Sequence, residues 1–394
     1  MYLRRQFLNQ IGQTSHTPQM FHPVHAEGCW MRDEHGQDYI DLSSGFSVSN
    51  LAHRHPNVLK AISEQMALYL HTTVYGEHLQ SPQLQLAQIL RSVLPESLDC
   101  FYFLNTGSET IDAVFKIARL HKPGCRIAAC RQAYHGSTLA AESLRSDKGH
   151  SAAFRPLVPG ILQLGFNEEN ELDQLVEDIG VIILEVVQAE AGVIKANPEW
   201  LYQLREKCKQ MNILLCFDEI QTGIGRTGSL YAFQQYGIIP DLLLTGKALG
   251  SGLPISAVVG SSVHIGLLAS KPGLSYLSTF GGNPLSAAAA AATLRTLMDQ
   301  NLSSRAIVIE EFFTSELKKY SRIASIRSAG ALISIDMSTT VKSLELLALA
   351  FQSKLLMESF LFAPQCVRIA PPLIISDSEL ELVIERLVVC LKKL

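Results

Sequence analysis

The stretch DLLLTGKALGSGLPISAVVG (241–260) places a lysine, Lys247, directly after a run of apolar residues and between glycines. A second apolar run upstream, ILLCFDEIQTGIGRTG (213–228), leads into an acid, Asp218. An amine nucleophile and a carboxylate, each at the end of an expected core strand, suit a lysine that holds an aldehyde cofactor as a Schiff base. The alternative is a lysine that starts a helix on a loop, and the neighbours of Lys247 favour the functional interpretation.

Apolar, β-rich runs alternate with helix-like stretches through the middle of the chain. Such near-continuous apolar runs are typical of strands buried on both faces of a mostly parallel sheet, with helices packed around it. Helical periodicity between them is seen in SETIDAVFKIARLHK, WLYQLREKCKQM and PLSAAAAAATLRTLMDQ. The expected strands lie in CFYFLNTG (100–107), RIAACRQA (126–133), VIILEVVQAE (181–190), ILLCFDEIQ (213–221), DLLLTGKA (241–248) and ISAVVGSS (255–262).

The two ends of the chain differ from the middle in their sequence pattern. Turn residues Gly28, Asp33 and Gly36 punctuate the segment EGCWMRDEHGQDYIDLSSG (27–45), which predicts a β-meander. After residue 295, amphipathic helices alternate with the strand-like runs IRSAGALISIDM and VRIAPPLII. We therefore expect an α/β chain with a large cofactor-binding domain over 51–295 and a small α+β domain built from 1–50 and 296–394.

Composition argues against several classes of function. The chain has 394 residues, 47% of them hydrophobic, and a net charge of −4, so nothing favours nucleic acid or an anionic membrane as a partner. No apolar run is long enough to span a membrane, and MYLRRQFLNQIGQ lacks the apolar core of a signal peptide. The eight cysteines form no C-x-x-C pair and predict free thiols of a cytoplasmic protein, and we expect no metal site.

Two polar turns follow expected strands. In FLNTGSET (103–110), backbone N–H groups at a helix start and the hydroxyls of Thr106 and Ser108 suit a phosphate, although an ordinary helix cap has the same pattern. In RQAYHGST (131–138), Tyr134 is placed to stack on a planar ring, and a core tyrosine with a satisfied hydroxyl is the alternative.

Acidic and amide side chains follow two further strands. Glu185, Gln188 and Glu190 lie just beyond an apolar run, at the strand end where open α/β sheets bind ligands. Burial of such acids without partners costs several kcal/mol, so we expect them to pair or to take part in chemistry. Asp218 is suited to a protonated ring nitrogen, and Gln221 to a ring hydroxyl.

The hexapeptide GIGRTG (223–228) fits the dinucleotide-binding pattern and has Asp241 downstream. The preceding strand ends in two acids, which would bring carboxylates near a pyrophosphate, and the motif does not open a β-α-β unit. We therefore reject the dinucleotide interpretation. Arg368, on an apolar strand beside a double proline, is either structurally paired or directed at a substrate carboxylate.

The combination of DEIQTGIGRTG, LLTGKALGSGLP and STFGGNP resembles the class III aminotransferases, pyridoxal-phosphate enzymes of fold type I. This group includes the acetylornithine, ornithine and 4-aminobutyrate aminotransferases. The resemblance runs from the GCWMRDEHGQDYIDLSSG meander through NLAHRHP to RIAPPL. It implies a homodimer with a shared active site, pyridoxal 5'-phosphate as cofactor, and a ping-pong transfer from an amino acid or ω-amine donor to a keto acid, with glutamate and 2-oxoglutarate as one pair.

The resemblance also implies roles for individual residues. Lys247 would hold the cofactor and shuttle protons, Asp218 would pair with the pyridine nitrogen, and Gln221 and Glu185 would lie near the ring hydroxyl. Gly107 and Ser108 would hold the phosphate, Tyr134 would stack on the ring, and Thr279 would reach the phosphate from the partner subunit. Arg368 would bind a substrate carboxylate, with Glu190 as a gate that pairs with it or releases it. The expected substrate pocket comprises Phe46, Val48, Tyr75, Ser137 and Ser278.

Departures from the family pattern leave the substrate open. Ser137 stands where acetylornithine enzymes usually carry arginine, and Gln221 where the diaminopelargonate branch typically has alanine. Val186 and Ala189 replace a usual proline and glycine, and Asp112 has no role that the sequence assigns. Two alternatives remain, namely another pyridoxal-phosphate reaction on the same fold, such as a decarboxylase or aminomutase, and a non-catalytic relative.

Overall fold

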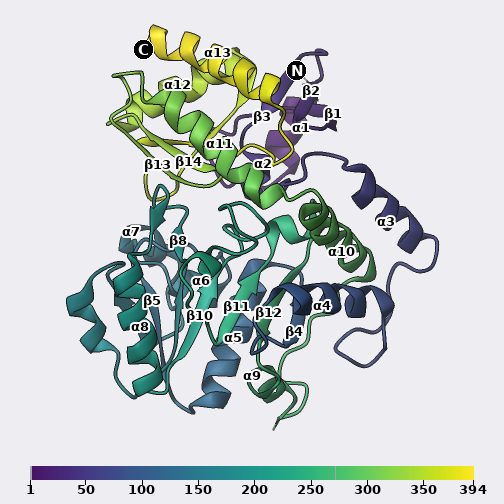
Figure 1. Cartoon of the computed structure of the whole chain (residues 1–394), viewed down its shortest axis with the longest axis vertical. Coiled ribbons are helices and arrows are strands. Elements are labelled where there is room, and N and C mark those ends of the chain that lie inside the picture. Colours follow the sequence, from purple (N-terminus) through teal and green to yellow (C-terminus); the bar gives the residue numbers. More distant parts are fainter. Residues whose placement is uncertain (1, 271) are drawn as a thin grey trace.

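A seven-stranded sheet forms the centre of the computed structural model, which describes residues 2–270 and 272–394 (Figure 1). Strand β12 is antiparallel to both of its neighbours, β4 and β11, whereas all the other neighbouring pairs are parallel. This confirms the mostly parallel sheet expected from the apolar runs. In spatial order the strands are β4 (Cys100–Leu104), β12 (Ser256–Gly260), β11 (Leu242–Thr245), β10 (Leu214–Asp218), β7 (Ile179–Leu184), β5 (Arg126–Cys130) and β6 (Ile161–Leu164).

Both faces of this sheet are buried. Successive residues of a strand point to opposite faces, so each strand contributes side chains to both buried clusters. In β7, Val181 and Ile183 belong to the cluster that contains Ile111 and Val114 of helix α5 (Gly107–His121), whereas Ile182 belongs to the other cluster. Such strands need apolar residues at every position. The remaining helices of this part of the chain are α3 (Pro56–Met66), α4 (Ser81–Val93), α6 (Leu139–Ser143), α7 (Lys148–Ser151), α8 (Pro198–Gln210), α9 (Ser262–Gly266) and α10 (Pro284–Asp299).

The two ends of the chain meet in a second lobe, at the top of Figure 1. The expected meander is present as β1 (Pro23–Glu27), β2 (Trp30–Asp33) and β3 (Asp38–Asp41), and β15 (Leu355–Leu356) pairs with β3 in parallel. A second small sheet has the order β13 (Ser325–Ala329), β14 (Leu332–Asp336), β17 (Cys366–Ile369) and β16 (Glu358–Ser359). The helices of this lobe are α1 (Tyr2–Gln10), α2 (Ser44–Ser47), α11 (Leu302–Leu317), α12 (Thr340–Gln352) and α13 (Asp377–Lys393).

The structure differs from the sequence expectation in two short segments. The run IRSAGALISIDM forms two antiparallel strands, because Gly330, at a φ of 56°, turns the chain back between β13 and β14. Edge strand β6, over ILQL, lies outside the apolar runs that we assigned to strands. The domain limits at residues 50 and 295 remain a prediction.

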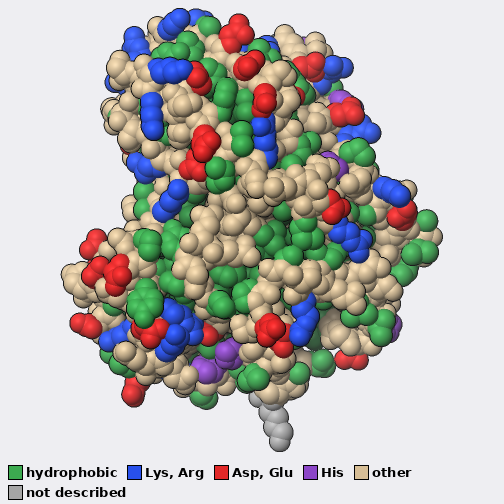
Figure 2. Space-filling model, viewed as in Figure 1, with side chains coloured by type: hydrophobic (Ala, Val, Ile, Leu, Met, Phe, Trp, Pro, Cys, Tyr) green, Lys and Arg blue, Asp and Glu red, His purple; other side chains and the backbone are tan. Residues whose placement is uncertain are grey.

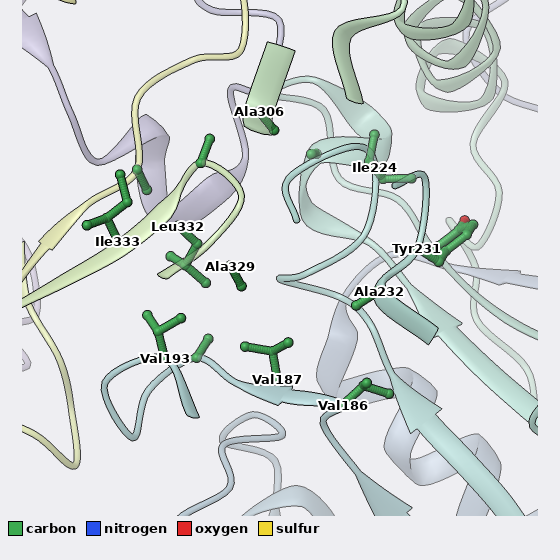
Figure 3. Packing of buried hydrophobic residues seen from close by; sticks show 14 of the residues in the cluster. Val186, Val187, Val193, Ile224, Tyr231, Ala232, Ala306, Ala329, Leu332 and Ile333 are labelled. Carbon is green, nitrogen blue, oxygen red and sulfur yellow. The ribbon is translucent and has the colours of Figure 1, made fainter. Parts of the chain in front are cut away.

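The two lobes are joined through a small hairpin of β8 (Val187–Gln188) and β9 (Ile194–Lys195). Figure 3 shows Val187 and Val193 of this hairpin beside Ala329 and Leu332 of the small lobe, and all four side chains are buried in one cluster. The hairpin therefore fixes the residues between its strands, including Glu190, at the boundary of the two lobes. Acidic and basic side chains are mixed over the face seen in Figure 2, in keeping with the net charge of −4.

Candidate active site

A cavity of about 390 Å³ opens at the carboxyl ends of the central strands. Each of five strands contributes residues to it from the turn that follows the strand or from its last position. These residues are Asn105 after β4, Tyr134 after β5, Glu185 after β7, Asp218 at the end of β10 and Lys247 after β11. Parallel sheets bind ligands at this edge, and the volume lies within the range usual for small-molecule sites.

Lys247 lies at the start of a short 3₁₀ helix (Lys247–Gly250), with a positive φ of 43°. Such a conformation is unfavourable for a lysine, and residues held in it often lie at active sites. Its Nζ donates a hydrogen bond to Oε1 of Gln221 at 2.5 Å. Burial lowers the pKa of Lys247 to about 8, and the negative charge of Glu190 partly opposes this effect. Near neutral pH a lysine of this kind loses its proton more readily than an ordinary lysine does.

Asp218 is held from two sides. Its Oδ2 lies 2.7 Å from Nδ1 of His135, and its Oδ1 accepts a hydrogen bond from the backbone N–H of Ile220 at 3.0 Å. Burial opposes protonation of His135, but the hydrogen bond and charge of Asp218 outweigh it and raise the pKa of this histidine. Burial also raises the pKa of nearby Glu185 to about 7, and Glu185 accepts backbone hydrogen bonds from Tyr134 and Ala189.

Helix α5 begins at the expected polar turn. Thr106 and Glu109 form a capping box, in which each side chain accepts from the other residue's backbone N–H. Ser108 Oγ accepts from the backbone N–H of Ser137 at 3.2 Å, which joins this turn to the loop that carries Tyr134. Gly136 makes the approach possible, because a Cβ there would overlap Ser108.

Asp112, which the sequence left without a role, accepts a hydrogen bond from Thr138 Oγ1 at 2.9 Å. Thr138 is the N-cap of helix α6. The bond therefore attaches the end of the Tyr134 loop to helix α5. In the same loop, the hydroxyls of Tyr134 and Ser137 lie 3.2 Å apart.

Arg368 on β17 and Glu190 on the hairpin between the lobes form a buried ion pair. Arg368 Nη2 donates to Glu190 Oε1 at 2.6 Å, and Gln221 Nε2 donates to the same oxygen at 3.4 Å. Burial alone would raise the pKa of Glu190, but the charges of Arg368 and Lys247 hold that pKa below its usual value. Lys247, Gln221, Glu190 and Arg368 thus form one hydrogen-bonded chain that crosses the boundary between the lobes.

The expected substrate residues divide into two groups. Val48 lines the cavity, and the Phe46 ring lies 5.3 Å from the Arg368 guanidinium. Tyr75 lines a different cavity of about 710 Å³, and the exposed Thr279 does not line the lysine cavity. Ser278 is buried behind the polar turn, where Asn105 Nδ2 donates to it at 2.7 Å. A single chain therefore does not bring Tyr75, Ser278 and Thr279 to Lys247.

Two further residues of the 218–228 region have roles that sequence patterns did not reveal. Glu219 is buried and accepts from Ala232 N at 2.8 Å and Phe233 N at 2.7 Å, which closes the intervening loop, and burial raises its pKa to about 7. Arg226, in the rejected dinucleotide motif, is buried and binds the small lobe. Its partners are Asn50 Oδ1, Ala331 O at 3.0 Å and Pro371 O at 2.6 Å.

In the part of the chain that comprises residues 2–270 and 272–394, no group of three or more His, Cys, Asp or Glu side chains could hold a metal ion. None of its helices combines the length and apolar character that a membrane crossing requires.

A lysine, a carboxylate and a helix-start turn meet at one edge of the sheet, an arrangement that suits a pyridoxal-phosphate enzyme. The chain belongs to the class III aminotransferases, since residues 11–391 match the family model described as "Aminotransferase class-III". Pyridoxal phosphate is therefore its cofactor, and transamination is its reaction.

Relatives of known name support this assignment over nearly the whole chain. An acetylornithine aminotransferase of Bacillus anthracis is 34% identical, with 94% of this chain and 95% of the relative covered. A succinylornithine transaminase of Salmonella paratyphi B is 33% identical, with 96% of this chain and 94% of the relative covered. The solved ornithine aminotransferase of Toxoplasma gondii ME49 is 26% identical and superimposes with a TM-score of 0.91 over 99% of this chain and 94% of that chain. The acetylornithine aminotransferase of Elizabethkingia anophelis is 28% identical and superimposes with a TM-score of 0.85 over 100% of this chain and 98% of that chain.

Proposed function

We propose that this aminotransferase transfers an amino group from an amino acid or ω-amine donor to a keto acid in two alternating half-reactions, with glutamate and 2-oxoglutarate as one pair. The chain of contacts from Lys247 through Gln221 and Glu190 to Arg368 carries this proposal, because it links a nucleophilic amine to a carboxylate-binding guanidinium. The names of the relatives favour an ornithine derivative as the donor, whereas Ser137 provides no second guanidinium in the place where acetylornithine enzymes carry one.

The residues at the cavity fit a phosphorylated aromatic aldehyde. When bound, the cofactor supplies a carbonyl that condenses with an amine and a ring that withdraws electrons from the substrate Cα. Lys247 Nζ would attach it covalently, and the first-turn N–H groups of α5 at Gly107 and Ser108, which have no intrahelical acceptors, suit the phosphate. Asp218, supported by His135, would place a negative charge at the ring nitrogen, and Tyr134 would cover one ring face.

Lys247 would also move the proton at the substrate Cα. Its pKa of about 8 means that the amine is partly neutral at neutral pH and can accept a proton. Gln221 orients Nζ through its amide oxygen, and Glu185 would lie near the ring hydroxyl and Gln221. These roles follow from the family pattern and from the contacts described above.

Glu190 and Arg368 would act as a gate for two kinds of substrate. With the pair closed, the charge of Arg368 is neutralised, so an uncharged or amine-bearing chain can occupy the space beside Phe46 and Val48. With Glu190 displaced, the guanidinium would bind the carboxylate of the keto acid. Of the other residues predicted for the pocket, Ser137 lies in the loop that carries Tyr134, whereas Tyr75 and Ser278 do not line the lysine cavity of their own chain.

A homodimer would bring Thr279 of one subunit to the phosphate site of the other. The exposed apolar side chains around this segment support such a partner surface, since Leu274 is 66%, Leu277 49% and Phe280 58% exposed. A cytoplasmic location is part of the proposal, because all eight cysteines are free.

A donor screen tests this proposal. The purified holoenzyme is mixed with single amino donors, loss of the visible absorbance of the lysine-bound cofactor is followed, and 2-oxoglutarate is then added. Ornithine derivatives or other ω-amines should convert the cofactor, and 2-oxoglutarate should restore the original spectrum with formation of glutamate. Release of carbon dioxide, or an isomerised amine without keto acid consumption, would favour a decarboxylase or an aminomutase instead.

A further inference from the structure

The segment that follows β16 contacts both members of the Glu190–Arg368 pair. The ring of Phe360 lies 4.5 Å from the Arg368 guanidinium carbon. The backbone N–H of Leu361 donates to Glu190 Oε2 at 3.1 Å, and the N–H of Phe362 donates to the Glu190 carbonyl at 3.0 Å. Three consecutive residues of the small lobe thus support the gate.

These contacts restrict how the gate can open. The backbone of the hairpin is attached to the small lobe by the Phe362 bond and by Arg327 Nε, which donates to Gly192 O at 2.7 Å. Space beside the hairpin is filled, because a Cβ at Gly192 would lie 3.1 Å from Ala363 Cβ. The Glu190 side chain must therefore rotate while its backbone stays in place, and this rotation breaks the Leu361 hydrogen bond.

The hydrogen-bond donors of Arg368 show why a substrate carboxylate competes with Glu190 for this side chain. Its Nε and Nη1 are buried without a hydrogen-bond partner, whereas Nη2 is occupied by Glu190. A carboxylate that binds in the bidentate manner uses two adjacent N–H groups, either Nη2 with Nε or Nη2 with Nη1. Nη2 has two N–H groups, one for each mode, and Glu190 uses one of them. A substrate carboxylate on the other would lie beside the Glu190 carboxylate, so the repulsion between the two negative charges makes the substrate compete with Glu190.

We propose that the backbone N–H of Leu361 is a positioning group that holds Glu190 on Arg368 and so sets how readily the enzyme accepts a carboxylate substrate. The inference rests on the proposed function, in which this pair is the gate. Because Glu190 Oε2 has the Leu361 N–H as its partner while Oε1 binds Arg368, both oxygens of the closed gate are held. Loss of the N–H should shift the gate toward its open position.

The variant Leu361→Pro removes this N–H, and Leu361→Ala keeps it while shortening a side chain that is 47% exposed. Glutarate is a suitable probe, since it has carboxylates but no amino or keto group to react. Calorimetry on the holoenzymes should show glutarate binding at least about tenfold tighter in Leu361→Pro, the scale expected for loss of one hydrogen bond to a charged group. Leu361→Ala should bind as the wild type does.

Steady-state kinetics provide a second measurement. In Leu361→Pro the KM for the keto acid should fall and the KM for the amine donor should rise, with kcat changed less than either. The difference between Leu361→Pro and Leu361→Ala should vanish in a Glu190→Ala background, because no carboxylate remains to be held. Equal glutarate affinities in the two single variants, or a difference that persists without Glu190, would overturn the proposal.

Hydrogen exchange on the wild-type holoenzyme tests the same bond if Leu361→Pro does not fold. The Leu361 amide should be protected in the resting enzyme and lose protection when glutarate is added. An amide that exchanges freely, or one that glutarate leaves unchanged, would refute the inference. The variant Arg368→Met should abolish glutarate binding, which shows that the probe reports on the gate. An enzyme that binds glutarate through Arg368 but transfers no amino group would contradict the proposed function and leave the role of Leu361 intact.

Discussion

The substitution Gly136→Ala tests whether the close contact between two loops creates the proposed phosphate site. An added Cβ would overlap Ser108 Oγ and lie 2.9 Å from Ser108 Cβ and 3.1 Å from its Cα, at a backbone φ of 124°. The backbone conformation costs roughly 1–3 kcal/mol for a residue other than glycine, and forced overlap costs roughly 1–3 kcal/mol more. The variant should therefore lose about 2–6 kcal/mol of stability and displace Ser108 from the helix start.

Cofactor affinity and thermal unfolding measure this effect. The dissociation constant of pyridoxal phosphate, titrated into the apoenzyme, should rise at least about tenfold, which corresponds to about 1.4 kcal/mol. Gly124→Ala is the matched control, because Gly124 also has a positive φ of 74° but no atom lies within 4 Å of its added Cβ. The control should show a small loss of stability and an unchanged cofactor affinity. Wild-type affinity in Gly136→Ala would refute the reasoning.

Three further predictions concern the lysine and the lobe boundary. Lys247→Ala should lose turnover while the cofactor still binds, and borohydride, which should fix the cofactor on wild-type Lys247, should fix none in the variant by mass spectrometry. The rate at which pyridoxal phosphate forms its Schiff base with the cofactor-free protein should rise with pH up to about 8 and then level off, as Lys247 loses its proton. Glu190→Gln should move this midpoint lower, because Glu190 raises the lysine pKa; a midpoint that stays in place would contradict the assignment. Arg226→Met should destabilise the protein by about 3 kcal/mol, since three buried acceptors lose their donor, whereas exposed Arg322→Met should have little effect in the same denaturant titration.

Contiguous motifs explain why much of the site could be predicted from the sequence. Lys247 and Asp218 each follow an apolar run, and the run itself indicates a buried strand whose end lies at the ligand-binding edge. The helix start at Thr106 was visible for the same reason, because capping depends on residues three positions apart. The chemical nature of the cofactor site is thus largely local information. The roles assigned to the individual residues stay predictions until they are measured.

The support of the site could not be predicted in this way. His135 contacts Asp218 only because the loop after β5 reaches the end of β10, with β7 between the two strands. Arg226 looked like part of a glycine-rich motif, and its partners Asn50, Ala331 and Pro371 lie far away in the chain. Strand order and lobe packing decide such pairs, and neither is encoded in local periodicity.

By itself, the sequence determined the class of fold, the family and the cofactor, and it predicted the reactive lysine, because strands, caps and motifs depend on short stretches of residues. Only the tertiary structure showed that Glu190 is held from the small lobe by the Leu361 N–H, and that Tyr75, Ser278 and Thr279 do not line the lysine cavity of their own chain. A backbone N–H carries no side-chain signature, and distances between residues far apart in the chain arise only when the two lobes pack together.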